Sequence, residues 1–83
     1  MSNLETTIQA MRADASTEVC SRSRVMDSLL DLRLVAQGRP DVTSVVDSAL
    51  ADLPGKTMVP GEWYRERLDM IELAAVNPVE PVG

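Results

Sequence analysis

Apolar residues recur with a helical period over the first part of the chain. At 100° per residue, one set of apolar side chains falls within an arc of about 80°, and its phase is the same before and after residue 20. Ser2 and Glu5 have the spacing of a capping box, and Gly38 with Pro40 supplies a stop signal. The pattern predicts one continuous helix over residues 3 to 37. The apolar set consists of Leu4, Ile8, Met11, Ala15, Met26, Leu29 and Ala36.

Two shorter helices are predicted downstream. Asp41 is expected as the N-cap of a helix over residues 42 to 53. The apolar residues of this segment follow the i, i+3, i+4, i+7, i+8, i+11 rule: Val42, Val45, Val46, Ala49, Leu50 and Leu53. A connector after Pro54-Gly55 leads to Pro60, which suits the first turn of a third helix over residues 61 to 75. Residues 77 to 83 are short and proline-rich and are expected to form a tail. The predicted fold is therefore an all-α, three-helix protein forming a single domain over residues 1 to 83.

An alternative concerns the middle of the first helix. Ala15-Ser16-Thr17 contains poor helix formers, and Ser16 is a candidate for a second N-cap. A break at Ser16 would let residues 2 to 14 fold back as a fourth helix. We favour the continuous helix because the phase of the apolar arc does not change at residue 20.

The length of the first helix suggests an interface. A helix over residues 3 to 37 would span about 52 Å, whereas a compact domain of this size has a diameter of about 30 Å. Helices 42 to 53 and 61 to 75 would cover only its second half. The apolar stripe of Leu4, Ile8, Met11 and Ala15 would then need a second copy of the chain or a larger protein partner. We therefore expect a homodimer or a hetero-complex closed by this helix.

Three arginines lie inside apolar arcs: Arg22, Arg33 and Arg67. Arg67 follows Trp63 by four residues and is expected to stack on the indole. One interpretation is that the arginines extend from the rim of the stripe into water, with only their methylene groups buried. The other is that they are polar anchors of an interface, where Arg and Trp are enriched. The predicted interface consists of Leu4, Ile8, Met11, Ala15, Arg22, Arg33, Trp63 and Arg67.

Composition and charge narrow the classes of partner. Hydrophobic residues make up 45% of the 83 residues, which is typical of a folded domain. Eight Lys and Arg against 13 Asp and Glu give a net charge of −5, which repels nucleic-acid backbones and anionic lipid surfaces. No apolar run approaches the length of a membrane span. We expect a cytoplasmic protein that binds neither nucleic acid nor a membrane.

No residue cluster predicts catalysis. The chain has no histidine, which removes the commonest general base and the commonest metal ligand. Asp27 and Asp31 lie on a polar face and are interpreted as solvated. Cys20 lies near Arg22 and Arg24, an arrangement that would suit a redox role, but without a second thiol or a base we interpret it as an inert surface thiol. We expect no catalytic site, metal, cofactor or small-molecule substrate.

Two motif comparisons fail on inspection. Gly55-Lys56-Thr57 matches the end of a phosphate-binding loop, but position 50 is Leu instead of the required Gly, and no strand precedes it. Residues 25 to 53 could form a helix-turn-helix, but the second helix presents Asp47 and Asp52 and no basic residue, which would repel DNA phosphates.

Two functional hypotheses remain. The first is a small non-enzymatic interaction protein, such as a dimeric adaptor, accessory subunit or regulator, that binds through the stripe of its first helix. The second is an acidic inhibitor or nucleic-acid-mimicking decoy that blocks a basic surface of a target. A decoy needs a dense array of carboxylates, whereas nine of the 13 acidic residues lie outside residues 12 to 39 and are spread over several faces. The dispersed charge favours the first hypothesis.

Overall fold

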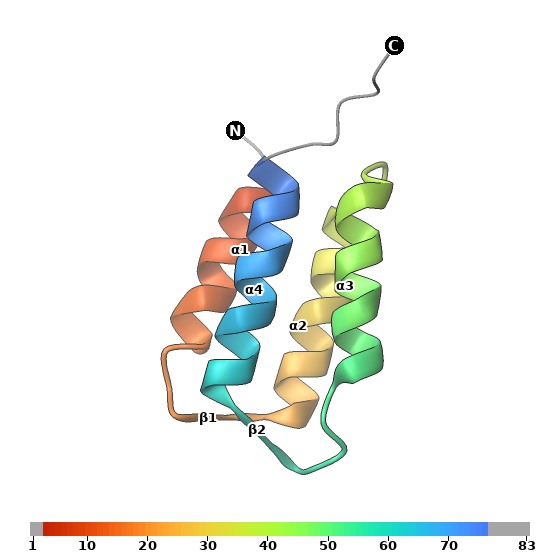
Figure 1. The fold of residues 1–83 in the computed structure, drawn as a ribbon. Coiled ribbons are helices and arrows are strands. Elements are labelled where there is room, and N and C mark those ends of the chain that lie inside the picture. The colour runs from red at the N-terminus through yellow and green to blue at the C-terminus, as the bar shows by residue number, and fades with distance from the viewer. Residues whose placement is uncertain (1–2, 77–83) are drawn as a thin grey trace.

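The computed structural model describes residues 3–76, which form four helices and a small two-stranded antiparallel sheet (Figure 1). This described part of the chain is mostly helical, and it has four helices instead of the predicted three. The predicted capping residue Ser2 and the predicted tail over 77–83 lie outside the described residues. The elements in chain order are α1 (Asn3–Asp14), β1 (Val19–Ser21), α2 (Arg22–Val35), α3 (Pro40–Asp52), β2 (Met58–Pro60) and α4 (Gly61–Val76).

The helices form an up-and-down bundle in which each helix packs against two neighbours. Helix α1 contacts α2 and α4, and α3 contacts the same two helices from the opposite side. Successive helices run antiparallel, as Figure 1 shows. The connections from α1 to α2 and from α3 to α4 therefore lie at the same end of the bundle, which we call the ribbon end. The turn from α2 to α3 lies at the other end, which we call the turn end.

The prediction of one helix over residues 3 to 37 is wrong. Helix α1 ends at Asp14, the chain turns over residues 15–18, and α2 begins at Arg22. Folding α1 back buries its apolar stripe inside the same chain, where apolar burial contributes about 25 cal/mol per Å² without a second copy. The described chain thus adopts the four-helix alternative with a break near Ser16. The stripe is buried, with exposures of 5% for Leu4, 1% for Ile8, 4% for Met11 and 0% for Ala15.

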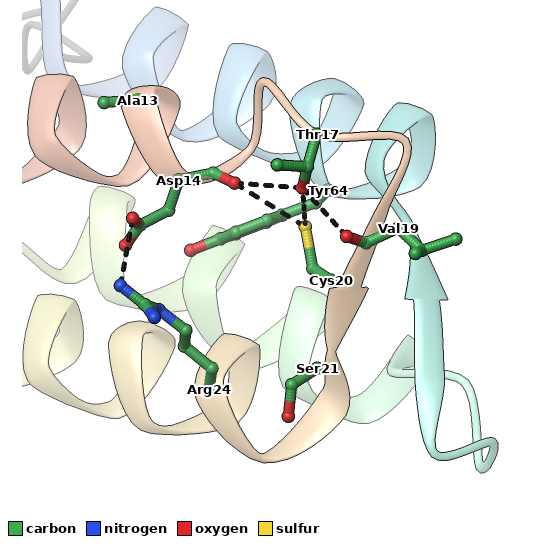
Figure 2. A pocket seen from close by; sticks show the side chains of 8 residues that line it. All are labelled: Ala13, Asp14, Thr17, Val19, Cys20, Ser21, Arg24 and Tyr64. Carbon is green, nitrogen blue, oxygen red and sulfur yellow. Dashed lines mark hydrogen bonds and ion pairs between the residues drawn. The ribbon is translucent and has the colours of Figure 1, made fainter.

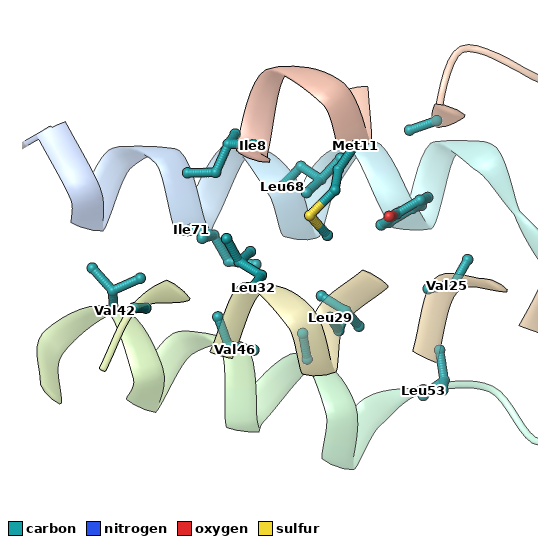
Figure 3. Packing of buried hydrophobic residues seen from close by; sticks show 14 of the residues in the cluster. Ile8, Met11, Val25, Leu29, Leu32, Val42, Val46, Leu53, Leu68 and Ile71 are labelled. Atoms are coloured by element: carbon teal, nitrogen blue, oxygen red, sulfur yellow. The ribbon is translucent and has the colours of Figure 1, made fainter. Parts of the chain in front are cut away.

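The core lies along the axis of the bundle, and all four helices contribute to it (Figure 3). Ile8 on α1 and Leu29 on α2 face Val46 on α3 and Leu68 on α4, and all four side chains are almost completely buried. Tyr64 is the largest of the fully buried side chains. Because the α1 stripe is part of this core, it is not available to form the homodimer contact that was expected from the sequence.

The two strands were not predicted. Val19 pairs with Pro60, Cys20 with Val59 and Ser21 with Met58. Residues 19–21 were assigned to the long helix and residues 58–60 to a connector with the start of a helix, because a three-residue strand is too short for a period of two to be recognised. Both strands bury only their central residue. They pair because the bundle brings two distant connections to one end.

The two shorter helices were predicted correctly apart from their first and last residues. The predicted ranges 42 to 53 and 61 to 75 correspond to Pro40–Asp52 and Gly61–Val76. Pro40 takes an early position of α3, where its missing N–H costs nothing, and Asp41 lies in the first turn instead of at the N-cap. The predicted stop is confirmed, since Gly38 has a φ of 91° in the turn between α2 and α3.

Candidate functional site

The residues predicted as one interface do not form one surface. Leu4, Ile8, Met11 and Ala15 lie in the core. At the ribbon end, Arg22 Nε donates a hydrogen bond to the Pro54 carbonyl oxygen over 2.8 Å. In the last turn of α2, Arg33 Nε donates to Asp47 Oδ1 over 2.6 Å. The partners of both arginines therefore come from their own chain.

Trp63 and Arg67 interact as predicted, within α4. The Arg67 guanidinium lies 5.3 Å from the centroid of the Trp63 ring, in cation–π range. Its Nη2 atom also lies 3.6 Å from Asp52 Oδ2 on α3. The pair therefore joins α4 to α3, which explains an arginine inside an apolar arc without an intermolecular interface.

A first candidate site is the exposed face of α2, which we call the α2 outer face and define as Asp27, Leu30, Asp31 and Leu34. Leu30 is 44% exposed and Leu34 is 61% exposed. Asp27 and Asp31 are exposed, as predicted, and neither takes part in an ion pair within residues 3–76. The spacing i, i+3, i+4, i+7 places two leucines and two free carboxylates on one side of one helix.

The sequence analysis missed the two leucines although the sequence carried a signal for them. At 100° per residue, Leu30 and Leu34 fall on the side of the helix opposite to Leu29 and Leu32. A single helix cannot bury both sides against one core. Its second apolar pair was therefore a candidate for a partner contact.

A shallow hollow of about 460 Å³ lies along the exposed side of α3. It is connected to α2 by the Arg33–Asp47 ion pair, because Asp47 is one of its lining residues. Most of its other side chains are small or carry hydroxyl groups. The lining residues are Pro40, Thr43, Ser44, Asp47, Ser48 and Ala51.

A second candidate site is a pocket of about 300 Å³ at the ribbon end (Figure 2). Cys20 lines it from β1 and is 8% exposed, so the interpretation of this residue as a surface thiol on a helix was wrong. The thiol lies 3.5 Å from Thr17 Oγ1 and 3.8 Å from the Asp14 carbonyl oxygen. Polar residues around the pocket are Asp14, Thr17, Cys20, Ser21, Arg24 and Tyr64.

Tyr64 contributes its ring to the wall of this pocket. The residue is 2% exposed, and its hydroxyl has no hydrogen-bond partner among the described residues. Burial raises the pKa of the phenol, because the charged phenolate is disfavoured away from water. The nearby Ser28 hydroxyl opposes this rise in pKa, but its geometry is too poor for a hydrogen bond. A buried hydroxyl without a partner costs about 1–3 kcal/mol.

One charged pair lies at the pocket. Arg24 Nη2 donates to Asp14 Oδ1 over 3.1 Å, with the arginine side chain 70% exposed and the aspartate 41% exposed. The Tyr64 hydroxyl points toward the space between these two side chains (Figure 2). The pocket therefore contains a cation, an anion and a buried neutral donor, with no net charge from this pair.

Comparisons with known proteins identify no relative. No protein-family model, curated protein or solved structure matches the chain. Within residues 3–76, no helix is long and apolar enough to cross a membrane, and no three metal-binding side chains are placed to hold an ion. The function must therefore be inferred from the two sites.

Proposed function

We propose that this protein is a small protein-binding module that holds a basic amphipathic helix of a larger partner on the α2 outer face. The observation that carries the proposal is the exposure of Leu30 and Leu34 beside two unpaired carboxylates. Exposed leucines lose contact with water when a partner covers them. The carboxylates favour a partner whose apolar residues are flanked by Lys or Arg.

The energies agree with a transient contact. Full burial of a leucine contributes about 1.5–3 kcal/mol, and these two side chains are already partly covered, so each adds roughly 1 kcal/mol. Two leucines alone do not hold a partner against the cost of association. Charge attraction to Asp27 and Asp31 and a wider contact area are needed as well.

The hollow along α3 provides that wider area. A specific interface covers about 800 Å² on each partner, which exceeds what one helix face offers. A partner helix lying on Leu30 and Leu34 would reach across the Arg33–Asp47 pair to the hydroxyl groups of Thr43, Ser44 and Ser48. The apolar contact then has a polar rim, as is typical of interfaces.

A second copy of the chain is a poor occupant of this face. The chain carries a net charge of −5, and a two-fold contact through α2 would bring Asp27 and Asp31 toward the same residues of the other copy. Like charges in a contact cost free energy that the leucines do not recover. A basic partner avoids this repulsion.

The proposal is tested with two variants of equal charge. Leu30→Asp with Leu34→Asp places two carboxylates on the α2 outer face, and Met70→Asp with Leu73→Asp places two on α4, where the side chains are 49% and 63% exposed. Immobilised wild type and both variants are exposed to native lysate, and the retained proteins are quantified. We expect a basic protein that the wild type and the α4 variant retain and the α2 variant loses.

Binding of the retained protein is then measured against salt concentration. Asp27→Asn with Asp31→Asn should flatten the salt dependence while circular dichroism shows an unchanged helix content. Equal loss in the α2 and α4 variants, or a retained protein without salt dependence, would contradict the proposal. Release of the partner by nucleic acid would instead favour the acidic decoy.

A further inference from the structure

The buried hydroxyl of Tyr64 has no hydrogen-bond partner among the described residues. Phenylalanine would fill the same space in the core without leaving a polar atom unpaired. The hydroxyl points toward Asp14 and Arg24 at the ribbon-end pocket (Figure 2). A molecule bound in the pocket can supply the missing hydrogen-bond acceptor.

The size of the pocket restricts the ligand. A volume of about 300 Å³ lies at the lower limit of cavities that bind small molecules. Each water takes about 30 Å³ in the liquid, so the pocket has room for one small organic molecule. Ala13 and Val19 add apolar surface to the lining.

The groups already paired within the pocket show what a ligand must offer. Thr17 Oγ1 donates to the Val19 carbonyl oxygen over 2.8 Å, and the Cys20 thiol faces Thr17 and the Asp14 backbone. Arg24, by contrast, makes one hydrogen bond, to Asp14, and has further N–H donors. The free donors among the lining side chains are therefore those of Tyr64, Arg24 and Ser21, and Arg24 is the charged one.

The charges in the pocket favour a zwitterion over a simple anion. Arg24 Nη2 and Asp14 Oδ1 are 3.1 Å apart. A lone carboxylate beside them would be attracted by Arg24 and repelled by Asp14, and the two electrostatic effects would largely cancel. A ligand with both charges can place its carboxylate at Arg24 and its ammonium group at Asp14. We propose that the pocket binds a small zwitterion of the amino-acid type, with Tyr64 donating a hydrogen bond to its carboxylate.

The test uses three ligands of similar size: alanine, propionate and ethylamine. Alanine carries both charged groups, propionate carries the carboxylate alone, and ethylamine carries the ammonium group alone. Each is titrated to roughly millimolar concentration, at which weak binding is detected, while amide resonances of residues 13–24 and 64 are followed by NMR. We expect saturable shifts with alanine and at least about tenfold weaker binding of the other two. Equal binding of alanine and propionate, or no shift with any of them, overturns the proposal.

Variants separate the ligand contact from the fold. Tyr64→Phe should gain thermal stability, because it removes a buried hydroxyl that has no partner, and should lose alanine affinity about tenfold. Arg24→Gln should lose affinity as well, whereas Arg33→Gln, which breaks an exposed ion pair elsewhere on α2, should not. Asp14→Asn should abolish the preference for alanine over propionate. Unchanged affinity in Tyr64→Phe contradicts the proposal.

Discussion

The two ends of the bundle are closed in different ways. At the ribbon end, two connections far apart in the sequence pair as strands, and α4 begins with its Gly61 amide donating to the Glu18 carbonyl oxygen over 2.8 Å. At the turn end, a few residues around Gly38 link α2 to α3, and Arg39 donates to carbonyl oxygens at the end of α4. The ribbon end thus depends on contacts between remote segments, and the turn end mainly on local conformation.

Two glycines illustrate the difference. Gly61 is buried, and a Cβ atom there would collide with the Thr17 carbonyl oxygen. Gly38 has open space around the same position, but its φ of 91° is one that residues with a side chain rarely adopt. Glycine is needed at one end because two backbones approach closely, and at the other because of a single backbone angle.

The largest effect is expected for Gly61→Ala. The added methyl group meets a backbone oxygen, which cannot rotate away, so the ribbon must shift and the hydrogen bond to Glu18 lengthens. We expect a loss of about 3 kcal/mol in the free energy of unfolding, measured by urea titration. Gly55→Ala, which adds a methyl group in open space in the same connection, serves as the control. Similar losses in both variants would show that close approach at Gly61 is unimportant.

A smaller loss is expected for Arg65→Met. Arg65 Nη1 on α4 donates to the Ala15 carbonyl oxygen over 2.6 Å and to the Thr17 carbonyl oxygen over 3.2 Å, and it thereby satisfies carbonyls left free where α1 ends. Its loss should cost about 1–2 kcal/mol. Amide hydrogen exchange should accelerate in the last turn of α1 and in β1, and remain unchanged near Gly38. Uniform acceleration would mean that Arg65 stabilises the whole bundle instead of the ribbon end.

At the turn end, Gly38→Ala should cost about 1 kcal/mol, since the cost is that of one left-handed residue. Gly38→Asn should cost less, because asparagine tolerates this conformation better than alanine. Thermal unfolding of the two variants gives the comparison. If alanine and asparagine are equally costly, the backbone angle is not the reason for glycine at this position.

The smallest effect is expected for acid titration at the turn end. Hydrogen bonds from Arg39 lower the pKa of Asp41, although burial acts in the opposite direction. The resulting stabilisation is present above the unfolded pKa of about 3.9 and is lost as the pH falls through the lower folded pKa. NMR titration of the Asp41 carboxyl group should show its pKa returning toward the ordinary value in Arg39→Gln. An unchanged pKa would remove Arg39 as the cause.

The break in the first helix shows where local pattern stops being informative. Leu4, Ile8 and Met11 have the same helical phase as Leu29, so periodicity alone favoured one helix. Ser16 and Thr17 indicated a weakness, but the choice depended on which arrangement buries the stripe. That burial involves α2 and α4, whose positions a helical pattern does not contain.

The candidate sites were less predictable than the helices. Asp27 and Asp31 were correctly predicted to be exposed, because charges on the polar side of a helix remain in water. The pocket could not be predicted, since Asp14, Cys20 and Tyr64 meet only after two connections have paired. Nothing in the sequence distinguishes a tyrosine hydroxyl that has a partner from one that has none.

The sequence by itself determined the helical character of the chain, the extents of α3 and α4, and the stop at Gly38. These features depend on interactions between residues a few positions apart, which propensity, capping and periodicity describe. The tertiary structure alone decided that α1 folds back, that β1 pairs with β2, and which of the two apolar sides of α2 is buried. Each of these outcomes depends on which remote surfaces compete to bury the same apolar area, and that competition is resolved only when the whole chain packs.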